Sequence, residues 1–445
     1  MKHSIVMKNN RLTAVLLFLL TGGAIFGQAG GGEMKLSLKE AQDYALQNNK
    51  SVKTAQLTVE ASQSDIWSTI SSGLPQVSFN GTFQDNFKLG VFVITFNGAP
   101  AVMKMGMTFN IPASIQAGMP IFNAPYYIGI ETVRLAKKLS ESNLRSTEID
   151  TRQSVAQAYY LILISEESKR ILKENLQALQ ETLKSTRAMF SSGLAEATDV
   201  DQMSSNVTMT ENSFSNLQNN IEINYNLLRF LLGVKSDMKL TLTESLDDMM
   251  KGVDVKTLLS QNLNASANIQ FDMMDKQEKL AALNLRAQKA KTLPTLSGFY
   301  ANSVSGMSNT MPVKSWFTSS YGGFQLTVPI FASGQKYTDI RKAKINLDKA
   351  RLAKEMVTDQ MEMQEKQLKF NLSNANLQYM SQKSNVDVAK RVYGSMENKY
   401  KQGVISSLEL TQANQLYLQA ENSYVSSMLN LLQTKLALDK LLSNN

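Results

Sequence analysis

Few side chains of this 445-residue sequence could perform chemistry, and counting them excludes most reaction classes. There is no cysteine, and the only histidine, His3, lies in a segment expected to be removed. Zinc sites of thiolates or imidazoles, Ser-His-Asp triads, cysteine nucleophiles and disulfides therefore lack their residues. Carboxylates remain, and two recur in one setting. Asp199 follows Gly193 by six residues, and Glu409 follows Gly403 by six.

The main chemistry left open is that of paired carboxylates, as in glycoside hydrolases. No acid pair stands in an aromatic-rich, loop-bearing segment, and the two tryptophans, Trp67 and Trp316, lie far apart in the sequence. We therefore expect no enzyme, no catalytic residue, no cofactor and no metal site. The two recurring acids must be explained by the elements that carry them.

Residues 1–29 have the pattern of a secretory signal peptide. Cationic residues are followed by an apolar run, Leu12–Phe26, and by small residues that predict cleavage after Ala29. The run is shorter than the roughly 20 residues of an anchoring helix. The weak, dispersed positive charge of the rest does not favour nucleic acid as a partner.

No later apolar stretch approaches the length of a membrane-spanning helix, and the longest candidate is Tyr159–Ile164. An exported chain of this kind can cross a membrane only as a closed β-barrel, because open sheet edges leave backbone groups unpaired in lipid.

The sequence contains one internal duplication. Four markers recur in the same order: a Leu-Pro pair, a Pro-Ile-Phe triplet, a glycine that interrupts a helical pattern, and an apolar closing segment. They begin at Leu74 and Leu293, Pro120 and Pro329, Gly193 and Gly403, and Phe230 and Lys440. The spacing between copies is 210 residues at both of the last two markers and 209 at the second, and it changes substantially only between the first two markers. This behaviour is typical of a duplicated fold.

Long polar segments that are rich in Ala, Leu, Gln, Glu and Lys and free of proline predict long helices. In the first half, an outgoing helix from Tyr126 to Ser191 is about twice as long as the return helix from Thr198 to Leu232. A helix from Leu36 to Ser71, stacked end to end on the return helix, would cover the rest of the apolar seam. The second half repeats this arrangement with 334–400, 407–441 and 255–291. The sequence thus predicts a tall, antiparallel helical wall.

The segments between the Leu-Pro and Pro-Ile-Phe markers alternate between apolar and polar residues. Met103–Met119 alternates over its whole length, shorter runs cover 76–84 and 323–330, and the segment near Leu296–Val304 is the least regular. Alternation with a period of two predicts strands with one apolar and one polar face. Each half offers one hairpin whose strands, at about 10 residues, are long enough to cross a bilayer.

Four strands cannot close a barrel, since the smallest outer-membrane barrels have about eight. Several copies must therefore share one barrel, with the helical walls continuing as a second tube. The alternative is a soluble hairpin packed on helices, but export and the two-hairpin repeat favour the shared barrel. The apolar run Gly90–Phe96 at the loop end of the first hairpin either extends the strand at the bilayer rim or caps the barrel mouth.

The doubled order of these motifs resembles the TolC-like outer membrane efflux protein family. The resemblance covers nearly the whole mature chain. It is carried by the paired Leu-Pro strand starts, by Met119–Asn123 and Val328–Ala332, and by the helix-turn tips Arg187–Gln202 and Asn398–Gln412. It implies a duplicated, mainly α fold with a β-barrel portion: a homotrimer whose 12-stranded barrel in the outer-membrane lipid continues into a long periplasmic α-helical barrel.

The resemblance also implies a function and a division of the chain. The function is that of a passive exit channel for small molecules or proteins, coupled to a periplasmic adaptor and through it to an inner-membrane transporter. The expected parts are a signal peptide (1–29), the periplasmic α-barrel (33–74, 121–292 and 330–445, with an equatorial link near 235–255) and outer-membrane hairpins (75–120 and 293–331).

The two tips combine a turn with a candidate docking surface. Gly193 and Gly403 interrupt the helical pattern where the chain must reverse, and glycine readily adopts the left-handed conformation of a helix C-cap. A structural turn is by itself a sufficient explanation of these glycines. Leu194, Val404 and Ile405 would, however, be exposed at the far periplasmic end, and we expect them to dock the adaptor.

The resemblance further implies a constricted entrance beside the tips. Tyr400 matches a tyrosine that bridges neighbouring helices, Asp199 the acid that can accept its hydroxyl, and Glu409 the first acid of a ring. Gln412 stands where a second ring acid can occur and Ile405 where an arginine can occur, so the full charged latch is not expected. Three copies of Glu409 around a narrow axis would repel one another and attract cations. The alternative is an ordinary solvated helix charge.

A periplasmic adaptor is the alternative identity for the whole chain, because adaptors are also exported and contain a helical hairpin. An adaptor needs compact β domains flanking one hairpin, whereas here both strand pairs lie inside the repeat.

Overall fold

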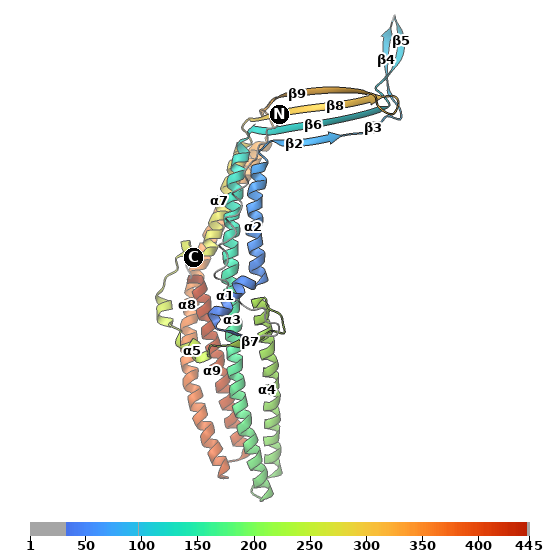
Figure 1. Cartoon of the computed structure of the whole chain (residues 1–445). Coiled ribbons are helices and arrows are strands. Elements are labelled where there is room, and N and C mark those ends of the chain that lie inside the picture. Colours follow the sequence, from blue (N-terminus) through green and yellow to red (C-terminus); the bar gives the residue numbers. More distant parts are fainter. Residues whose placement is uncertain (1–32, 97, 443–445) are drawn as a thin grey trace, which may run out of the picture.

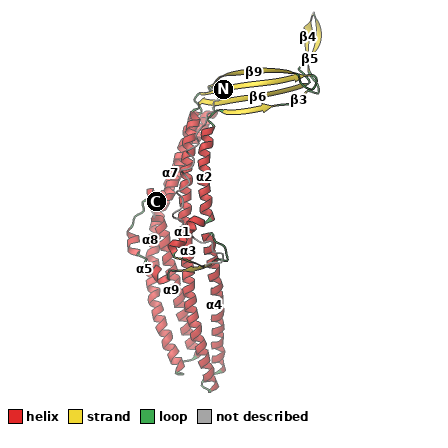
Figure 2. Ribbon diagram, in the orientation of Figure 1, coloured by secondary structure: helices red, strands yellow, loops and turns green. Residues whose placement is uncertain are grey.

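The computed structural model describes residues 33–96 and 98–442. The expected signal peptide, residues 1–29, lies outside the described residues. The described chain is an elongated stalk of helices with a sheet at one end (Figures 1 and 2). The fold is therefore mainly α with a β portion, as the sequence predicts.

The elements follow the duplicated order. The helices are α1 Leu38–Asn48, α2 Lys50–Ser71, α3 Ala124–Ser191, α4 Ala197–Leu232, α5 Leu246–Lys251, α6 Val255–Ser260, α7 Ile269–Ala290, α8 Gln335–Lys401 and α9 Ser407–Leu442, with a 3-10 turn at Ala265–Ala267. The strands are β1 Glu33–Leu36, β2 Gln76–Gly81, β3 Gln84–Asp85, β4 Gly90–Phe96, β5 Ala99–Met105, β6 Phe109–Phe122, β7 Lys239–Leu242, β8 Thr295–Ser308 and β9 Ser315–Thr327.

Helices and strands share one lateral order. Next to the sheet, α2, α3, α7 and α8 lie side by side, and towards the tips the order is α4, α3, α9 and α8. In the sheet, β2, β6, β8 and β9 are neighbours in that order. In the chain, α2 leads into β2, β6 into α3, α7 into β8 and β9 into α8. Each of the four helices next to the sheet is therefore connected to one strand, and the strands have the same lateral order as the helices.

Two expected helices are interrupted in the structure. The segment expected as one helix from Leu36 to Ser71 begins as strand β1, which pairs in parallel with β7, and then breaks at Asn49 into α1 and α2. The second-half segment expected as Val255–Lys291 contains α6, the 3-10 turn and α7. Helix propensity does not register these breaks, because they are made by contacts with residues distant in sequence.

The break at Asn49 is a joint between stacked helices, and Asn268 makes the same joint in the second half. The Asn49 side-chain oxygen accepts the N–H of Ser51 at the start of α2, and its amide donates to Leu231 O at the end of α4, at 2.7 Å. Asn268 accepts from Gln270 N and donates to Leu441 O at 3.1 Å. Both asparagines are buried. Each side chain therefore caps one helix and binds the end of the helix stacked on it.

Replacing Asn49 by alanine is expected to lower the free energy of unfolding by about 2 kcal/mol, because the helix cap is lost and a buried carbonyl loses its donor. Asn49→Asp keeps the cap acceptor but removes the donor, so it isolates the bond to Leu231. Asn48→Ala is the matched control, since the Asn48 amide binds only Tyr44 O of its own helix. Denaturant unfolding followed by circular dichroism measures all three, and equal effects at Asn48 and Asn49 would refute the joint.

The largest apolar core lies midway along the stalk, where α1, α3, α4, α9, β1 and β7 meet. Tyr159 is fully buried there, and its hydroxyl donates to Leu36 O at 3.1 Å and accepts the N–H of Glu244. Burial raises the pKa of Tyr159 to about 12, so it stays neutral. One tyrosine thus ties α3 both to β1 and to the segment after β7.

The strand expected from Met103 to Met119 is two strands in the structure. Gly106 has a left-handed φ of 94°, and the chain before it, β5, pairs only with β4 as a separate hairpin. After it, β6 pairs with both β2 and β8. The alternation of side-chain types continues through this break between β5 and β6, which is why the sequence pattern did not reveal it. The region expected to be least regular, near Leu296–Val304, lies in the 14-residue strand β8.

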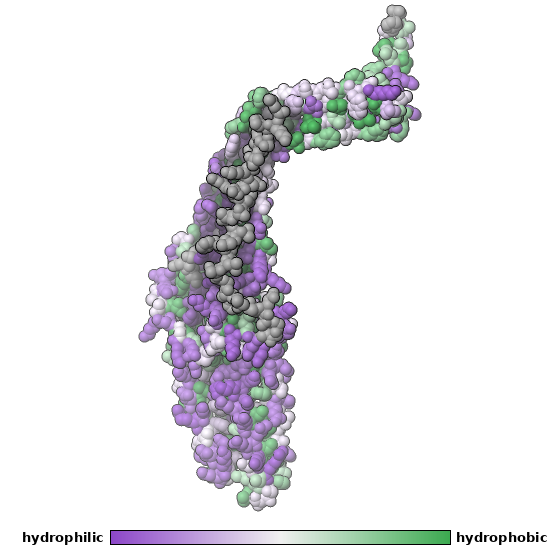
Figure 3. Space-filling view, in the orientation of Figure 1, coloured by the Kyte–Doolittle hydropathy of each residue, from purple (hydrophilic) through white to green (hydrophobic). Residues whose placement is uncertain are grey.

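The sheet carries many exposed apolar side chains, while the tip half of the stalk is mainly hydrophilic (Figure 3). Within the described parts of the chain, no helix combines the length and apolar character needed to span a membrane.

Candidate functional site at the two helix tips

The two tips are built by the same backbone motif. Gly193 and Gly403 have left-handed φ values of 74° and 71°. In each turn the N–H of the next residue binds a carbonyl of the helix that has just ended: Leu194 N to Met189 O, and Val404 N to Lys399 O. This is the Schellman arrangement, in which glycine satisfies the last carbonyls of the helix. The glycines are therefore required by the turns themselves.

The side chains after the two glycines differ in exposure. Leu194 is 79% exposed and Val404 66%, so both project from the ends of the stalk. Ile405 is half-buried against the cluster that contains Tyr400 and Leu410. Three residues were expected to dock a partner. Ile405 packs mainly within its own chain, so only Leu194 and Val404 offer exposed apolar side chains at the tips.

Asp199 and Glu409 occupy one structural position, the third residue of the return helix. The Asp199 carboxylate accepts the N–H of Glu196 at 3.0 Å, and the Glu409 carboxylate accepts the N–H of Ser406 at 2.9 Å. Each acid completes a capping box at the start of α4 or α9. Each acid lies six residues after its glycine because the chain needs that many residues to complete the turn and reach the third position of the return helix.

The carboxylate of Glu409 remains available to solvent. It is fully exposed, and the pKa of Glu409 is lowered by hydrogen bonds from the backbone N–H and then the hydroxyl of Ser406. Glu409 is therefore ionised at neutral pH. Gln412, one helical turn further along α9, is also exposed.

Tyr400 and Asp199 have different partners from those that the family resemblance implies. The Tyr400 hydroxyl lies 2.7 Å from the Thr186 hydroxyl, and Thr186 donates its own proton to Thr182 O, so Tyr400 is the donor. Asp199 instead accepts the hydroxyl of Ser407 on α9. The carboxylate is held by its capping box and by Ser407, which leaves the buried tyrosine to bridge α8 to α3. Burial raises the pKa of Tyr400.

These contacts belong to a larger polar seam between the helix pairs α3–α4 and α8–α9. Towards the tips each pair has its own apolar cluster. Between the pairs, hydrogen bonds join Asn206 to Thr411 at 2.8 Å and Asn175 to Asn414 at 2.5 Å. We define the polar seam as Asn175, Thr186, Asp199, Gln202, Asn206, Tyr400, Ser407, Thr411 and Asn414.

The sequence analysis missed most of this seam. A signal was present, because Asn175, Thr182 and Thr186 follow one another at spacings of seven and four along one face of α3, among buried leucines. Ser407, Thr411 and Asn414 recur at helical spacing on α9. Polar residues at such core positions are typical of helix interfaces that fix register at the expense of stability.

A cavity of about 590 Å³ opens between the two tips. It is lined from both turns, by Leu194, Glu196 and Asp199 on one side and by Tyr400, Gly403 and Ser407 on the other. Three residues of the seam, Asp199, Tyr400 and Ser407, therefore line the space between the tips.

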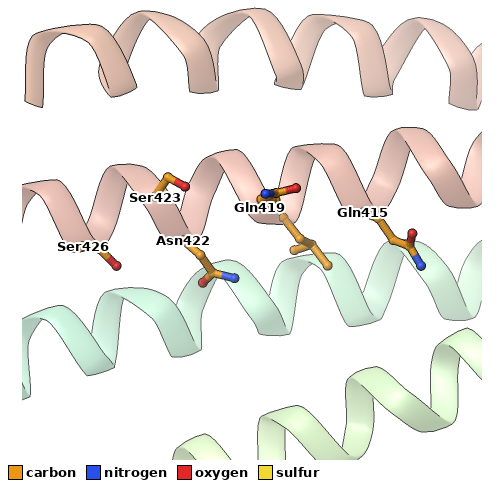
Figure 4. A pocket seen from close by; sticks show the side chains of 6 residues that line it. Gln415, Gln419, Asn422, Ser423 and Ser426 are labelled. Atoms are coloured by element: carbon orange, nitrogen blue, oxygen red, sulfur yellow. The ribbon is translucent and has the colours of Figure 1, made fainter. Parts of the chain in front are cut away.

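The exposed face of α9 above Glu409 is mainly polar and uncharged, although Leu416 is exposed on it and Leu418 lines the same groove. Gln415, Gln419, Asn422, Ser423 and Ser426 follow one another at helical spacing along an open groove of about 510 Å³ (Figure 4). Glu409 and Gln412 continue the same spacing towards the tip. Amides and hydroxyls in this pattern offer donors and acceptors to a passing polar solute without binding it by charge. In the described residues, no group of three or more His, Cys, Asp or Glu could hold a metal ion.

Comparison with known families assigns this architecture. The sequence pattern of the family described as outer membrane efflux protein matches residues 42–234 and 259–444. The chain belongs to the outer membrane efflux protein family. Membership places the chain in the outer membrane, with its helical stalk in the periplasm, and this family is one of channels rather than enzymes.

Curated relatives from Pseudomonas putida agree with this assignment. The probable efflux pump outer membrane protein TtgC (strain KT2440) and the antibiotic efflux pump outer membrane protein ArpC are each 27% identical over 310 residues. These alignments cover 68% of this chain and 62% of each relative, so they span less than two thirds of the relatives' length.

Solved structures show the same fold across nearly the whole chain. The structure of CusC gives a TM-score of 0.73 at 16% identity, covering 95% of this chain and 96% of that one. VceC from Vibrio cholerae gives 0.70 at 14% identity, with coverage of 92% and 96%. MtrE of Neisseria gonorrhoeae gives 0.69 at 17% identity, with coverage of 91% and 88%. At these identities the likeness establishes the fold.

Proposed function

We propose that this chain forms a homotrimeric exit channel in the outer membrane. It works passively with a periplasmic adaptor and an inner-membrane transporter to export small molecules or proteins. The observation that carries the proposal is the common lateral order of helices and strands, which leaves one copy with unpaired edges at both levels. The adaptor alternative has no support, because the relatives are outer-membrane proteins and strands from both halves of the chain join in one main sheet, β2-β6-β8-β9, at the end of the stalk.

The sheet ends on one side at β2 and on the other at β9. Such edges are not tolerated in lipid, and pairing β2 of one copy with β9 of the next would remove both. A contact between two different edges propagates around an axis and closes as a ring. Three copies of a four-stranded unit supply 12 strands.

The helical edges carry the matching apolar surfaces. Along α8, exposed apolar residues recur every four or seven positions, and α2 with α4 exposes apolar residues on the opposite edge. They are Leu352, Met356, Met363, Phe370 and Leu377 on α8, and Leu57, Met209, Ile223, Leu227 and Phe230 on α2 and α4. A spacing of seven is that of a coiled-coil seam. These stripes are the surfaces that a ring of copies would bury.

Three of the four strands are by themselves long enough for the membrane part, and β2 and β3 together cover residues 76–85 on the fourth. β6 and β8 have 14 residues and β9 has 13. At about 3.4 Å per residue and a tilt of about 40°, they rise through roughly 35 Å, slightly more than the hydrocarbon core. We assign the membrane part to 75–120 and 293–331 and the periplasmic part to 33–74, 121–292 and 330–445, with 1–29 as a signal peptide.

The assembly is tested by measuring the mass of the purified protein in detergent and its conductance in planar bilayers. We expect a particle of three copies with discrete channel openings. A monomer without channel activity would refute the proposal. A Leu352→Asp, Met363→Asp variant is expected to lose the trimer, whereas the corresponding Asp substitutions at Gln364 and Lys383, exposed polar positions of α8 outside the apolar stripe, are the controls.

Glu409 is proposed to form the acidic ring of the entrance, with Tyr400, Asp199 and Gln412 beside it. Glu409→Gln is expected to reduce the preference for cations over anions severalfold, because the substitution removes three fixed negative charges from a narrow pore. Glu60→Gln is the control, since Glu60 is an exposed acid of α2, away from the tips. Reversal potentials in a salt gradient measure selectivity. If the Glu409→Gln channel kept the same preference for cations, the proposal that Glu409 forms an acidic ring would be wrong.

Tyr400→Phe is expected to raise the open probability of the channel about fivefold. The change removes only the hydroxyl that donates to Thr186, a bond worth about 1 kcal/mol in holding the helix pairs together. Tyr393→Phe is the matched control, because the buried Tyr393 hydroxyl has no hydrogen-bond partner. Single-channel recording distinguishes them, and equal open probabilities in both variants would contradict the role of the seam.

A further inference from the structure

Strands β4 and β5 form a hairpin that stands apart from the main sheet. They pair only with each other, from Gly90 with Met105 to Phe96 with Ala99. The hairpin leaves the sheet at the end farthest from the helices and points away from it (Figure 1). In an outer-membrane channel this end of the sheet is the outer mouth.

Both faces of this hairpin are apolar. Cross-strand partners lie on the same face, so one face carries Phe92 with Met103 and the other carries Val93 with Val102. These four side chains are all more than half exposed. Lys104 is the only charged residue in the two strands. A strand pair that faced water on one side would alternate apolar with polar residues, and this one does not.

A hairpin of this kind would be unstable by itself both in water and in the hydrocarbon of the membrane. In water, a lone two-stranded hairpin with two apolar faces is marginal at best. In hydrocarbon, its two outer edges would leave backbone N–H and C=O groups without partners, each at a cost of several kcal/mol. The hairpin therefore requires a protein surface on both faces.

We propose that the β4–β5 hairpins of neighbouring copies pack against one another across the outer mouth and narrow it. This inference rests on the proposed trimer, in which every copy brings the same hairpin to the same height around one axis. Such contacts continue the interface between β2 and β9 at the end of the barrel. No second kind of protein is needed to cover the apolar faces.

The contact is one of apolar side chains rather than a continuous strand ladder. Pro100 in β5 has no N–H to donate, which weakens strand addition at that edge. Val91, Val93 and Val102 on one face, and Phe92, Ile94 and Met103 on the other, are the surfaces to be buried.

The first test uses the absence of cysteine from the chain. Single variants Val93→Cys and Val102→Cys are treated in membranes with a short bis-maleimide. We expect cross-linked dimers of the chain at both positions and none at Lys88→Cys, an exposed position outside the hairpin. Absence of cross-linking at both hairpin positions, in protein whose mass in detergent is that of a trimer, would overturn the inference. A monomeric mass would instead refute the proposed function.

The second test replaces the apolar faces without changing strand preference. In the variant Val91→Thr, Val93→Thr, Ile94→Thr, Val102→Thr, the β-branched side chains become polar, and we expect a trimer whose conductance at least doubles. An unchanged conductance would overturn the inference.

The other possible occupants are separated by an environment-sensitive fluorophore attached to the thiol of the Val93→Cys variant. We expect the label in the pure trimer to be shielded from both lipid and water by the neighbouring copies. Quenching by brominated lipid would show contact with lipid, and full access to aqueous iodide in the pure trimer would point to another protein. Either result overturns the proposal.

Discussion

Gly233→Ala is expected to destabilise the protein by about 2–5 kcal/mol, although it adds a single methyl group. Gly233 ends α4 with a left-handed φ of 70°, a conformation that costs any other residue about 1–2 kcal/mol. The added Cβ would also lie 2.5 Å from Asn48 O and 3.0 Å from Asn48 C. Those atoms are backbone, so they cannot move aside as a side chain would. Overpacking of this kind costs about 1–3 kcal/mol more.

The expected damage extends beyond the turn, because Asn48 immediately precedes the joint residue Asn49. A displacement of Asn48 would pull the Asn49 amide from Leu231 O and separate α2 from α4. Gly394→Ala is the matched control: Gly394 lies within α8, no other atom lies within 4 Å of where an added methyl group would be, and alanine there should stabilise the protein by about 0.5–1 kcal/mol. Denaturant unfolding and trimer yield measure both changes. Similar effects of the two substitutions would show that the close approach at Gly233 is unimportant.

The large features of the fold could be predicted because they depend on local pattern and on repetition. The return helix ends at Leu232, as expected, and the long helix α3 begins two residues before the expected Tyr126. The interruption at Asn49 was missed because asparagine at a helix boundary looks like any polar helical residue until its partner, 182 positions away, is known. The hairpin β4–β5 was missed because alternation of side chains does not record that the chain leaves one strand at Gly106 before it enters the next.

The site was predicted less completely than the fold, for a related reason. The turn glycines follow from backbone conformation, which is local. The partner of Tyr400 is Thr186, 214 positions away, and no spacing within one segment could identify it. The recurrence of Asp199 and Glu409 was visible in the sequence, but its first physical cause is the capping of α4 and α9. The proposed ring at the entrance adds a second role only to the exposed Glu409.

Leu194→Asp combined with Val404→Asp is expected to abolish export while leaving the trimer and its conductance intact. The two side chains project from the ends of the stalk and make no cluster within the chain, so the fold does not need them. Covering a leucine or valine contributes about 1.5–3 kcal/mol, and a trimer would offer six such sites to its adaptor. Because linked contacts reinforce one another, their joint loss should reduce adaptor binding by more than a hundredfold.

Conservative variants show whether export depends on the apolar side chains at the tips or on the backbone conformation of the turns. Leu194→Met with Val404→Ile keeps both glycines and an apolar surface, and it should export as the wild type does. Ile405→Asp should instead lower stability, because Ile405 packs against the cluster containing Tyr400. Drug or dye efflux from cells and co-purification of the cognate adaptor provide the readouts. If the double Asp variant exported normally, the adaptor would have to dock elsewhere on the stalk, and the exposed tips would serve only to reverse the chain.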